Sequence, residues 1–233
     1  MLKQSRLDAL ADGIFAIVMT LLVIELRIPE IYQYATETEL IGFLIEKLPL
    51  FISYMLSFTL LFVYWRAHHY IASVLARNID QRLAAINAFF LMLIALVPFS
   101  THLIGAFSYS QIAIIFYGGN MILISITLLW MRLYIRDSRT IDNIEVDHAS
   151  EVRGMMRIIM PAVMATAAIG LSFINTNWSL LLFLIAIFFN LSDSSRLVYK
   201  VFKRLNKFLA IDTPVKKLVK RNTKARAKSS NQK

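Results

Sequence analysis

The residues best placed to do chemistry in this chain are ionisable and aromatic side chains at the ends of two apolar segments. Arg6 and Asp12 stand at the start of the first segment, and Trp65, His68 and His69 stand at the end of the second. Ionisable groups inside a membrane are costly and usually have partners, and charged groups make strong hydrogen bonds. This set predicts a hydrogen-bonded clamp that joins the two segments. The alternative is that each side chain reaches separately for the lipid headgroups.

The first apolar segment also carries a stripe along one helical face. At roughly 100° per residue, Ile17, Thr20, Leu21 and Ile24 fall within one arc, and Asp12 projects to the far side. Taken alone, such a stripe is typical of ordinary packing in a monomeric bundle. The Asp12 carboxylate is expected to face neighbouring helices.

Enzyme and metal chemistry have little support in the sequence. The chain has no cysteine, and adjacent His68 and His69 point to different helical faces instead of forming an i, i+4 pair. The sequence also lacks Gly-x-Ser-x-Gly, His-Glu-x-x-His and a glycine-rich phosphate loop. We expect no enzyme activity, no metal site and no cofactor.

The elements that must position these residues are membrane helices. Hydrophobic residues make up 58% of the chain and its mean hydropathy is +0.60, which exceeds what a soluble domain carries. Six apolar runs approach the ~20 residues that cross a bilayer as a helix. They lie at 12–28, 43–64, 83–103, 110–134, 155–174 and 178–192. The sequence predicts an all-α membrane protein with six transmembrane helices.

Basic residues predict the orientation of these helices. Lys and Arg gather before the first span, between the second and third, and between the fourth and fifth. Because such residues are enriched on the cytoplasmic side, both termini are expected inside the cell. The first loop on the opposite side is acidic, with Glu30, Glu37, Glu39 and Glu46.

The net charge of +10 is concentrated in the C-terminal tail. Twelve of the 25 Lys and Arg residues follow residue 199, together with one acid, Asp212. We divide the chain into a six-helix transmembrane domain, 1–199, and a polybasic cytoplasmic tail, 200–233. Anionic lipid headgroups attract such a tail. Nucleic-acid binding is not expected, because no aromatic platform or recognised binding module accompanies the charge.

Together these residues resemble the endolysosomal potassium channels and their single-repeat prokaryotic relatives. That family opens its first helix with Arg-x-x-x-Phe-Ser-Asp, followed by Gly-x-x-Ala-Ile-x-x-Thr-Leu-Leu-Val. The matching residues are Arg6, Asp12, Gly13, Ala16, Ile17, Thr20, Leu21, Leu22 and Val23, whereas Leu10 and Ala11 replace the Phe and Ser. The likeness extends through Tyr64-Trp65-x-x-His68-His69 and through Asn87 to Leu96-Val-Pro98-Phe-Ser-Thr101.

The resemblance implies a potassium-permeable cation channel in which four six-helix copies surround a pore lined by the first helix. Ile17 would then form the hydrophobic constriction, Leu21 and Ile24 further apolar layers, and Thr20 a hydroxyl near the ion. Arg6, Asp12, Trp65, His68 and His69 would form a structural and gating network. Selectivity for K⁺ over Na⁺ should be modest, because the chain lacks a Thr-Val-Gly-Tyr-Gly filter. Other monovalent cations should also permeate.

Further expectations concern departures from the family and other function classes. Leu10 and Ala11 are expected off the pore face, so that they affect gating or stability before selectivity. A lone six-helix copy looks like the prokaryotic members, which implies a bacterial plasma membrane. Two alternatives stay open: a secondary transporter, for which Asn87 and His102 are the polar midplane candidates, and a noncatalytic membrane scaffold that uses its basic tail.

Overall fold

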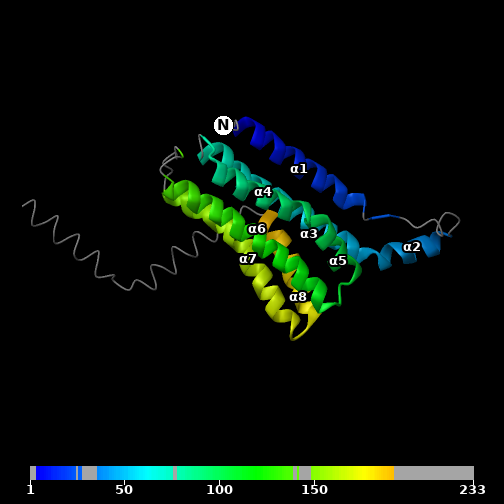
Figure 1. The fold of residues 1–233 in the computed structure, drawn as a ribbon. Helices are drawn as coiled ribbons and strands as arrows, with labels where there is room; N and C mark the ends of the chain where they lie inside the picture. Colours follow the sequence, from blue (N-terminus) through cyan, green and yellow to red (C-terminus); the bar gives the residue numbers. More distant parts are fainter. Residues whose placement is uncertain are drawn as a thin grey trace, which may run out of the picture. The chain divides into compact units, whose positions relative to one another are not determined.

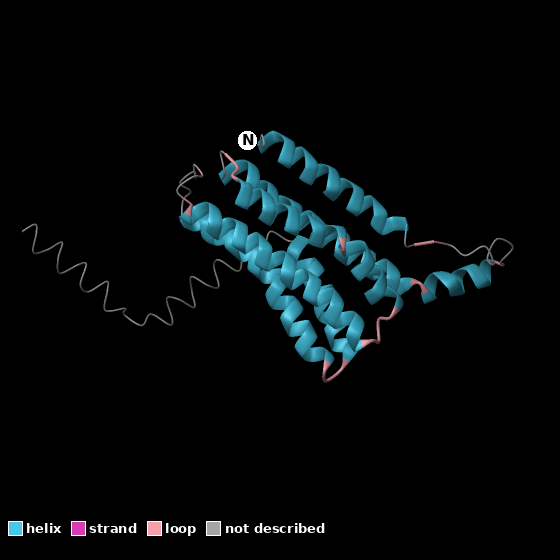
Figure 2. Ribbon diagram, in the orientation of Figure 1, coloured by secondary structure: helices cyan, strands magenta, loops and turns pink. Residues whose placement is uncertain are grey.

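The computed structural model describes residues 4–24, 26–27, 36–75, 78–138, 141 and 148–191, with side chains except at 73–75, 148–153, 184 and 186–191. Glu30 and the polybasic tail, 200–233, therefore lie outside the described residues. Every regular element in the described part is a helix, as the cyan ribbons of Figure 2 show. The all-α prediction is confirmed for this part of the chain.

The helices follow one another along the chain and all lie in one unit, Met1–Ser194 (Figure 1). They are α1 (Gln4–Ile24), α2 (Glu37–Glu46), α3 (Leu48–His69), the π-helical turn η2 (Tyr70–Leu75), α4 (Gln81–Ala95), α5 (Val97–Ala106), α6 (Gln111–Asp137), α7 (His148–Ser172) and α8 (Thr176–Leu191).

Five stretches of the described chain are long and apolar enough to cross a membrane. They are Gln4–Ile24, Leu48–Ala72, Gln81–Ala106, Gln111–Asp137 and Gly154–Ser172. They correspond to the first five predicted spans. The sixth predicted span coincides with α8, of which 16 residues are described, fewer than the ~20 that a straight crossing needs, so the sixth span stays a prediction.

The first loop contains a helix that we did not expect. The N-terminus of α2 is capped by Thr36, whose hydroxyl accepts a hydrogen bond from the Glu39 N–H, while the Glu39 carboxylate accepts one from the Thr36 N–H at 2.7 Å. The backbone bond from Thr36, with a second from its hydroxyl, holds the pKa of the Glu39 carboxyl below its usual range. Two of the loop's acidic residues, Glu37 and Glu39, thus serve the first turn of α2.

The third predicted span is divided into two helices. Helices α4 and α5 meet at Leu96, which is the C-cap of α4 and the N-cap of α5. Pro98 lies in the first turn of α5, where its missing N–H breaks the hydrogen-bond ladder of a continuous helix. The proline therefore accounts for the interruption of the helix at this point of the membrane crossing.

Helix α3 lies at the centre of the bundle, in contact with α1, α5, α7 and α8. Hydroxyl groups connect it to its neighbours: Thr101 of α5 donates to Ser57 of α3 at 2.7 Å, and Ser57 bonds to the Tyr117 hydroxyl of α6 at 3.0 Å. Tyr64 donates to the Met121 carbonyl at 3.2 Å. These buried interhelical bonds fix the packing of α3, α5 and α6, because lipid offers no alternative partner.

Gly105 allows α5 to approach α3 closely. A Cβ at this position would lie 2.5 Å from both Leu50 Cδ1 and Ser53 Oγ, and 3.1 Å from Leu50 Cα. The backbone atom cannot move aside as a flexible side chain could.

We therefore expect Gly105→Ala to destabilise the bundle by about 1–3 kcal/mol, the usual range for overpacking. Thermal unfolding of the purified protein in detergent measures this as a lower Tm. Gly170→Ala is the control, because a Cβ at Gly170 meets nothing within 4 Å. Equal melting temperatures for the Gly105 variant and the parent would show that α3 and α5 are not packed this closely.

Candidate functional site

Helix α1 has one buried and one open face. Ala11, Phe15, Val18 and Leu22 are at most 4% exposed and recur at the spacing of one helical stripe, which packs against α3, α4 and α5. The predicted stripe lies on the other face. Ile17 is 59% exposed, Leu21 41% and Ile24 42%. Within its own chain, α1 therefore leaves the three apolar residues of the stripe uncovered.

Thr20 lies on the open face with its hydroxyl directed at its own helix. The hydroxyl donates back to the carbonyls of Ile17, at 2.8 Å, and Ala16, at 3.0 Å. A hydroxyl has one proton and two acceptor lone pairs, so this arrangement occupies the proton and leaves the oxygen able to accept. The exposed oxygen of Thr20 can thus contact a cation.

Leu10 corrects one expectation. It precedes Ile17 by seven residues, or two helical turns, and is 55% exposed, so it lies on the open face as an extension of the stripe. The prediction that Leu10 lies off this face is therefore wrong. Ala11, by contrast, is 1% exposed and packs against the bundle, as expected.

The Asp12 carboxylate turns away from the stripe toward α3. It accepts a hydrogen bond from the Trp65 indole N–H at 2.8 Å, which joins the first two predicted spans. The Trp65 ring in turn stacks on His69, with ring centroids 5.9 Å apart and an angle of 20° between the planes. Asp12, Trp65 and His69 therefore form one group at this end of α1 and α3.

His68 belongs to a separate, buried group. Its Nε2 lies 2.6 Å from the Asn87 side-chain oxygen on α4, and its ring stacks parallel to Phe90, with centroids 5.0 Å apart. Phe15 of α1 packs against both rings, with centroids 6.2 Å from His68 and 6.0 Å from Phe90. His68 thus links α1, α3 and α4 through aromatic contacts and one polar bond.

The predicted clamp is only partly assembled. Asp12 reaches Trp65 directly, whereas Arg6 is exposed and has no hydrogen bond or ion pair within the described chain. Asn87, Phe15 and Phe90 complete the His68 group, a set of contacts that the sequence does not predict. Asn87 was visible as a polar residue in an apolar span, but its partner lies on another helix and no spacing rule identifies it.

Burial distinguishes α1 and α7 from the central helices. In both helices, 22% of the most apolar 18-residue stretch is buried, against 56% of the corresponding stretch in α6. A Cβ would meet nothing within 4 Å at Gly13 on α1 and at Gly170 on α7, which is also true of Gly119 on α6. The bundle alone does not require either glycine, so each helix offers a face on which another chain could approach closely.

We expect the hydrogen bond between Asp12 and Trp65 to help hold α1 against α3. Trp65→Phe keeps an aromatic ring but removes the only donor of the indole, so α1 should loosen at its N-terminal half. Hydrogen–deuterium exchange of peptides from residues 4–16 should become faster in this variant. Trp130→Phe, at an exposed tryptophan of α6, is the control and should leave these peptides unchanged. Unchanged exchange in both variants would mean that the bond does not hold α1.

Comparisons with known proteins agree with one another. A family model described as the endosomal/lysosomal potassium channel TMEM175 matches residues 6–98. A protein of Chamaesiphon minutus named as a potassium channel is 32% identical over 135 residues, covering 57% of this chain and 64% of the relative. One of Streptomyces collinus, also named as a potassium channel, is 25% identical over 179 residues, covering 74% of this chain and 84% of the relative.

A potassium channel of a Chryseobacterium strain is 30% identical over 125 residues, covering 54% of this chain and 61% of the relative. The matched stretches thus span a little under two thirds of the Chamaesiphon and Chryseobacterium relatives. All three relatives are named as channels, not as enzymes.

A solved structure is similar over most of the chain. It is described as the crystal structure of a lysosomal potassium-selective channel TMEM175 homolog from Chamaesiphon minutus, and it superposes with a TM-score of 0.66 at 26% identity. The superposition covers 80% of this chain and 95% of that structure. The fold, the family model over residues 6–98 and the named relatives together confirm the resemblance seen in the sequence: this chain is an integral, multi-pass membrane protein that is similar to the TMEM175 potassium channels.

Proposed function

We propose that this chain forms a potassium-permeable cation channel whose pore is lined by α1. The observation that carries the proposal is the open apolar face of α1, where Ile17, Leu21 and Ile24 are uncovered by their own chain on a helix that the family model matches. Helix α7 is equally open, but it lies beyond the matched residues 6–98. The names of the relatives support potassium as the permeating ion.

One open stripe per chain cannot enclose a conduit, so the proposal requires several copies around an axis. We propose four copies of a six-helix unit, with α8 as the sixth span. The open space around Gly13 supports a close approach of neighbouring α1 helices. In a bacterial plasma membrane both termini would lie on the cytoplasmic side. The tail, 200–233, would contact anionic lipid headgroups there.

The proposed conduction path runs along the open face of α1. A ring of Ile17 side chains forms the narrowest, driest layer, with Leu21 and Ile24 as further apolar layers and Leu10 toward the other end. A hydrophobic constriction conducts only when it is wetted, and it strips water from the ion more readily when hydration is weak. Such a pore prefers K⁺ over Na⁺ modestly, and the Thr20 oxygens replace part of the lost hydration. It needs no cofactor besides the permeating ion.

The polar groups behind α1 would act on gating. Asp12 and Trp65 bond on the side of α1 away from the stripe, and His68 bonds to Asn87 within the bundle. Neither pair faces the proposed path, so each holds the position of α1 instead of contacting the ion. The His68–Asn87 bond also counts against a secondary transporter, because it commits one of the two polar midplane candidates to helix packing.

Ile17→Asn tests the constriction. A polar ring would hydrate the layer that isoleucine keeps dry, so single-channel conductance should rise or the K⁺/Na⁺ permeability ratio should fall. Planar-bilayer recordings of the purified protein under bi-ionic conditions measure both. Ile126→Asn is a matched control, because Ile126 is an exposed isoleucine of α6 outside the proposed pore. If the two variants have equal effects, Ile17 does not form the constriction; if the parent conducts no ions as a folded oligomer, a transporter or scaffold becomes the better hypothesis.

Gly13→Leu tests which open helix faces the neighbouring copy. Because a side chain at Gly13 meets open space within the chain, the variant should keep its fold but lose its oligomer. Gly170→Leu on α7 has the same open surroundings and should keep the oligomer. Mass measurement of the detergent-solubilised complexes by light scattering distinguishes them. The reverse pattern would place α7 at the interface and remove α1 from the pore.

A further inference from the structure

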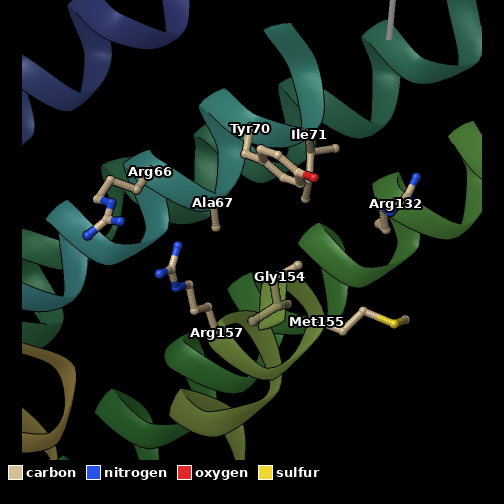
Figure 3. A pocket seen from close by; sticks show the side chains of 9 residues that line it. Arg66, Ala67, Tyr70, Ile71, Arg132, Gly154, Met155 and Arg157 are labelled. Atoms are coloured by element: carbon tan, nitrogen blue, oxygen red, sulfur yellow. The ribbon is translucent and has the colours of Figure 1, made fainter. Parts of the chain in front are cut away.

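Two cavities in the described part of the chain lie at opposite ends of α3. The smaller, about 40 Å³, adjoins the last turn of α3, and Arg66, Arg132 and Arg157 contribute to its wall. Figure 3 shows the Arg132 guanidinium directed away from Arg66 and Arg157, so these three cations do not converge on one point. The larger cavity, about 200 Å³, adjoins the beginning of α3 and lies between α3, α5 and α8.

The larger cavity has a buried floor and an exposed mouth. The floor is formed by side chains that are at most 3% exposed, namely Leu56 of α3, Ile104 of α5 and Phe183 of α8. The mouth is formed by exposed residues at or near helix ends, namely Pro49, Tyr109 and Asn177. A molecule can therefore enter at this end of the bundle and place its apolar part inward.

Contacts behind the floor keep the α8 wall in place. The Phe183 ring meets the Tyr117 ring of α6 edge-on, with centroids 5.3 Å apart, and the Tyr117 hydroxyl bonds to Ser57 at 3.0 Å. One turn earlier on α8, the buried Ser179 hydroxyl donates to the Ala168 carbonyl of α7 at 2.8 Å. Since these contacts fix α8 against α6 and α7, the cavity is pre-formed, as ligand sites usually are.

Two buried hydroxyls face this mostly apolar space. Ser53, 5% exposed, donates to the Leu50 carbonyl at 2.8 Å, so its oxygen is left to accept. Ser108, 7% exposed, makes no side-chain hydrogen bond within the described part of the chain, so it can both donate and accept. A buried polar group without a partner is costly. A ligand that carries a hydroxyl would satisfy Ser108.

The size and charge of the cavity limit what it can hold. An engineered cavity of ~150 Å³ in another protein binds benzene, so about 200 Å³ accommodates one ring with a short polar substituent. None of the described lining residues is charged. An ionic ligand would lose its hydration here without a compensating partner. The cavity therefore favours a neutral molecule.

We propose that this cavity binds a small neutral alcohol whose apolar body is about the size of one ring. The hydroxyl of the ligand bonds to Ser108, and the ring packs against Leu56, Ile104 and Phe183. None of the described lining residues belongs to α1, so the site is separate from the proposed pore and does not depend on it.

The test measures binding to the full chain in lipid nanodiscs by ¹⁹F NMR titration, with empty nanodiscs as the reference for partition into lipid. The probes are 4-fluorobenzyl alcohol and 4-fluorotoluene, which lacks the hydroxyl. Leu180→Phe enlarges a side chain that lines the cavity. Leu181→Phe, at the exposed neighbouring position on α8, is the matched control.

We expect the parent to bind the alcohol saturably, with an apparent Kd that rises at least about tenfold in Leu180→Phe and less than about twofold in Leu181→Phe. Such a difference would place the ligand in the cavity. Equal weakening in the two variants, or only non-saturable partition by the parent, would overturn the proposal.

Ser108→Ala tests the hydroxyl without filling the cavity, and it also decides the matter if Leu180→Phe fails to fold. The apparent Kd for the alcohol should rise about fivefold, as for the loss of one neutral hydrogen bond, and that for 4-fluorotoluene should stay unchanged. Ser110→Ala, in the same loop but outside the lining, is the control and should bind both probes as the parent does. If the parent binds 4-fluorotoluene as tightly as the alcohol, the cavity takes an apolar group such as a lipid acyl chain, which contradicts the proposed ligand.

Discussion

The absence of water around a membrane helix is the constraint on which the rest of this structure depends. A polar group there must find its partner inside the protein, because lipid provides none. The described bundle meets this demand with short interhelical bonds, such as Thr101 to Ser57 and His68 to Asn87, and with hydroxyls that bond to their own helix, such as Thr20. The positions of the helices follow from these few polar pairs as much as from apolar packing.

The same constraint gives α1 its unusual character. One stripe of Ala11, Phe15, Val18 and Leu22 attaches it to the bundle, and the Asp12–Trp65 bond adds a direct polar contact to α3. The opposite face presents apolar side chains with one hydroxyl among them. A helix of this kind is attached strongly enough to have a defined orientation, yet most of its surface is available to something other than its own chain.

Sequence reasoning reached the features that depend on local periodicity. The apolar runs located five stretches that the structure forms, and the turn angle placed Asp12 opposite Ile17. Leu10 was misplaced although the same periodicity would have put it on the stripe, since positions seven apart share a face. The partner of His68 could not be predicted, because it depends on which helices become neighbours in space. Helix α2 lies where the sequence predicts only an acidic loop, and two of the acidic residues, Glu37 and Glu39, occupy its first turn.

The break at Leu96 has a mechanical meaning. An interrupted membrane helix often serves as a hinge, but here the segments on both sides of the break contact the same helix, α3. Helix α4 does so through Asn87 and His68, and α5 through Thr101, Ser57 and the close approach at Gly105. The segments on both sides of the break are therefore each tied to α3. A movement of α1 would therefore be taken up at its own contacts with these helices, namely the packing of Phe15 against His68 and Phe90 and the Asp12–Trp65 bond.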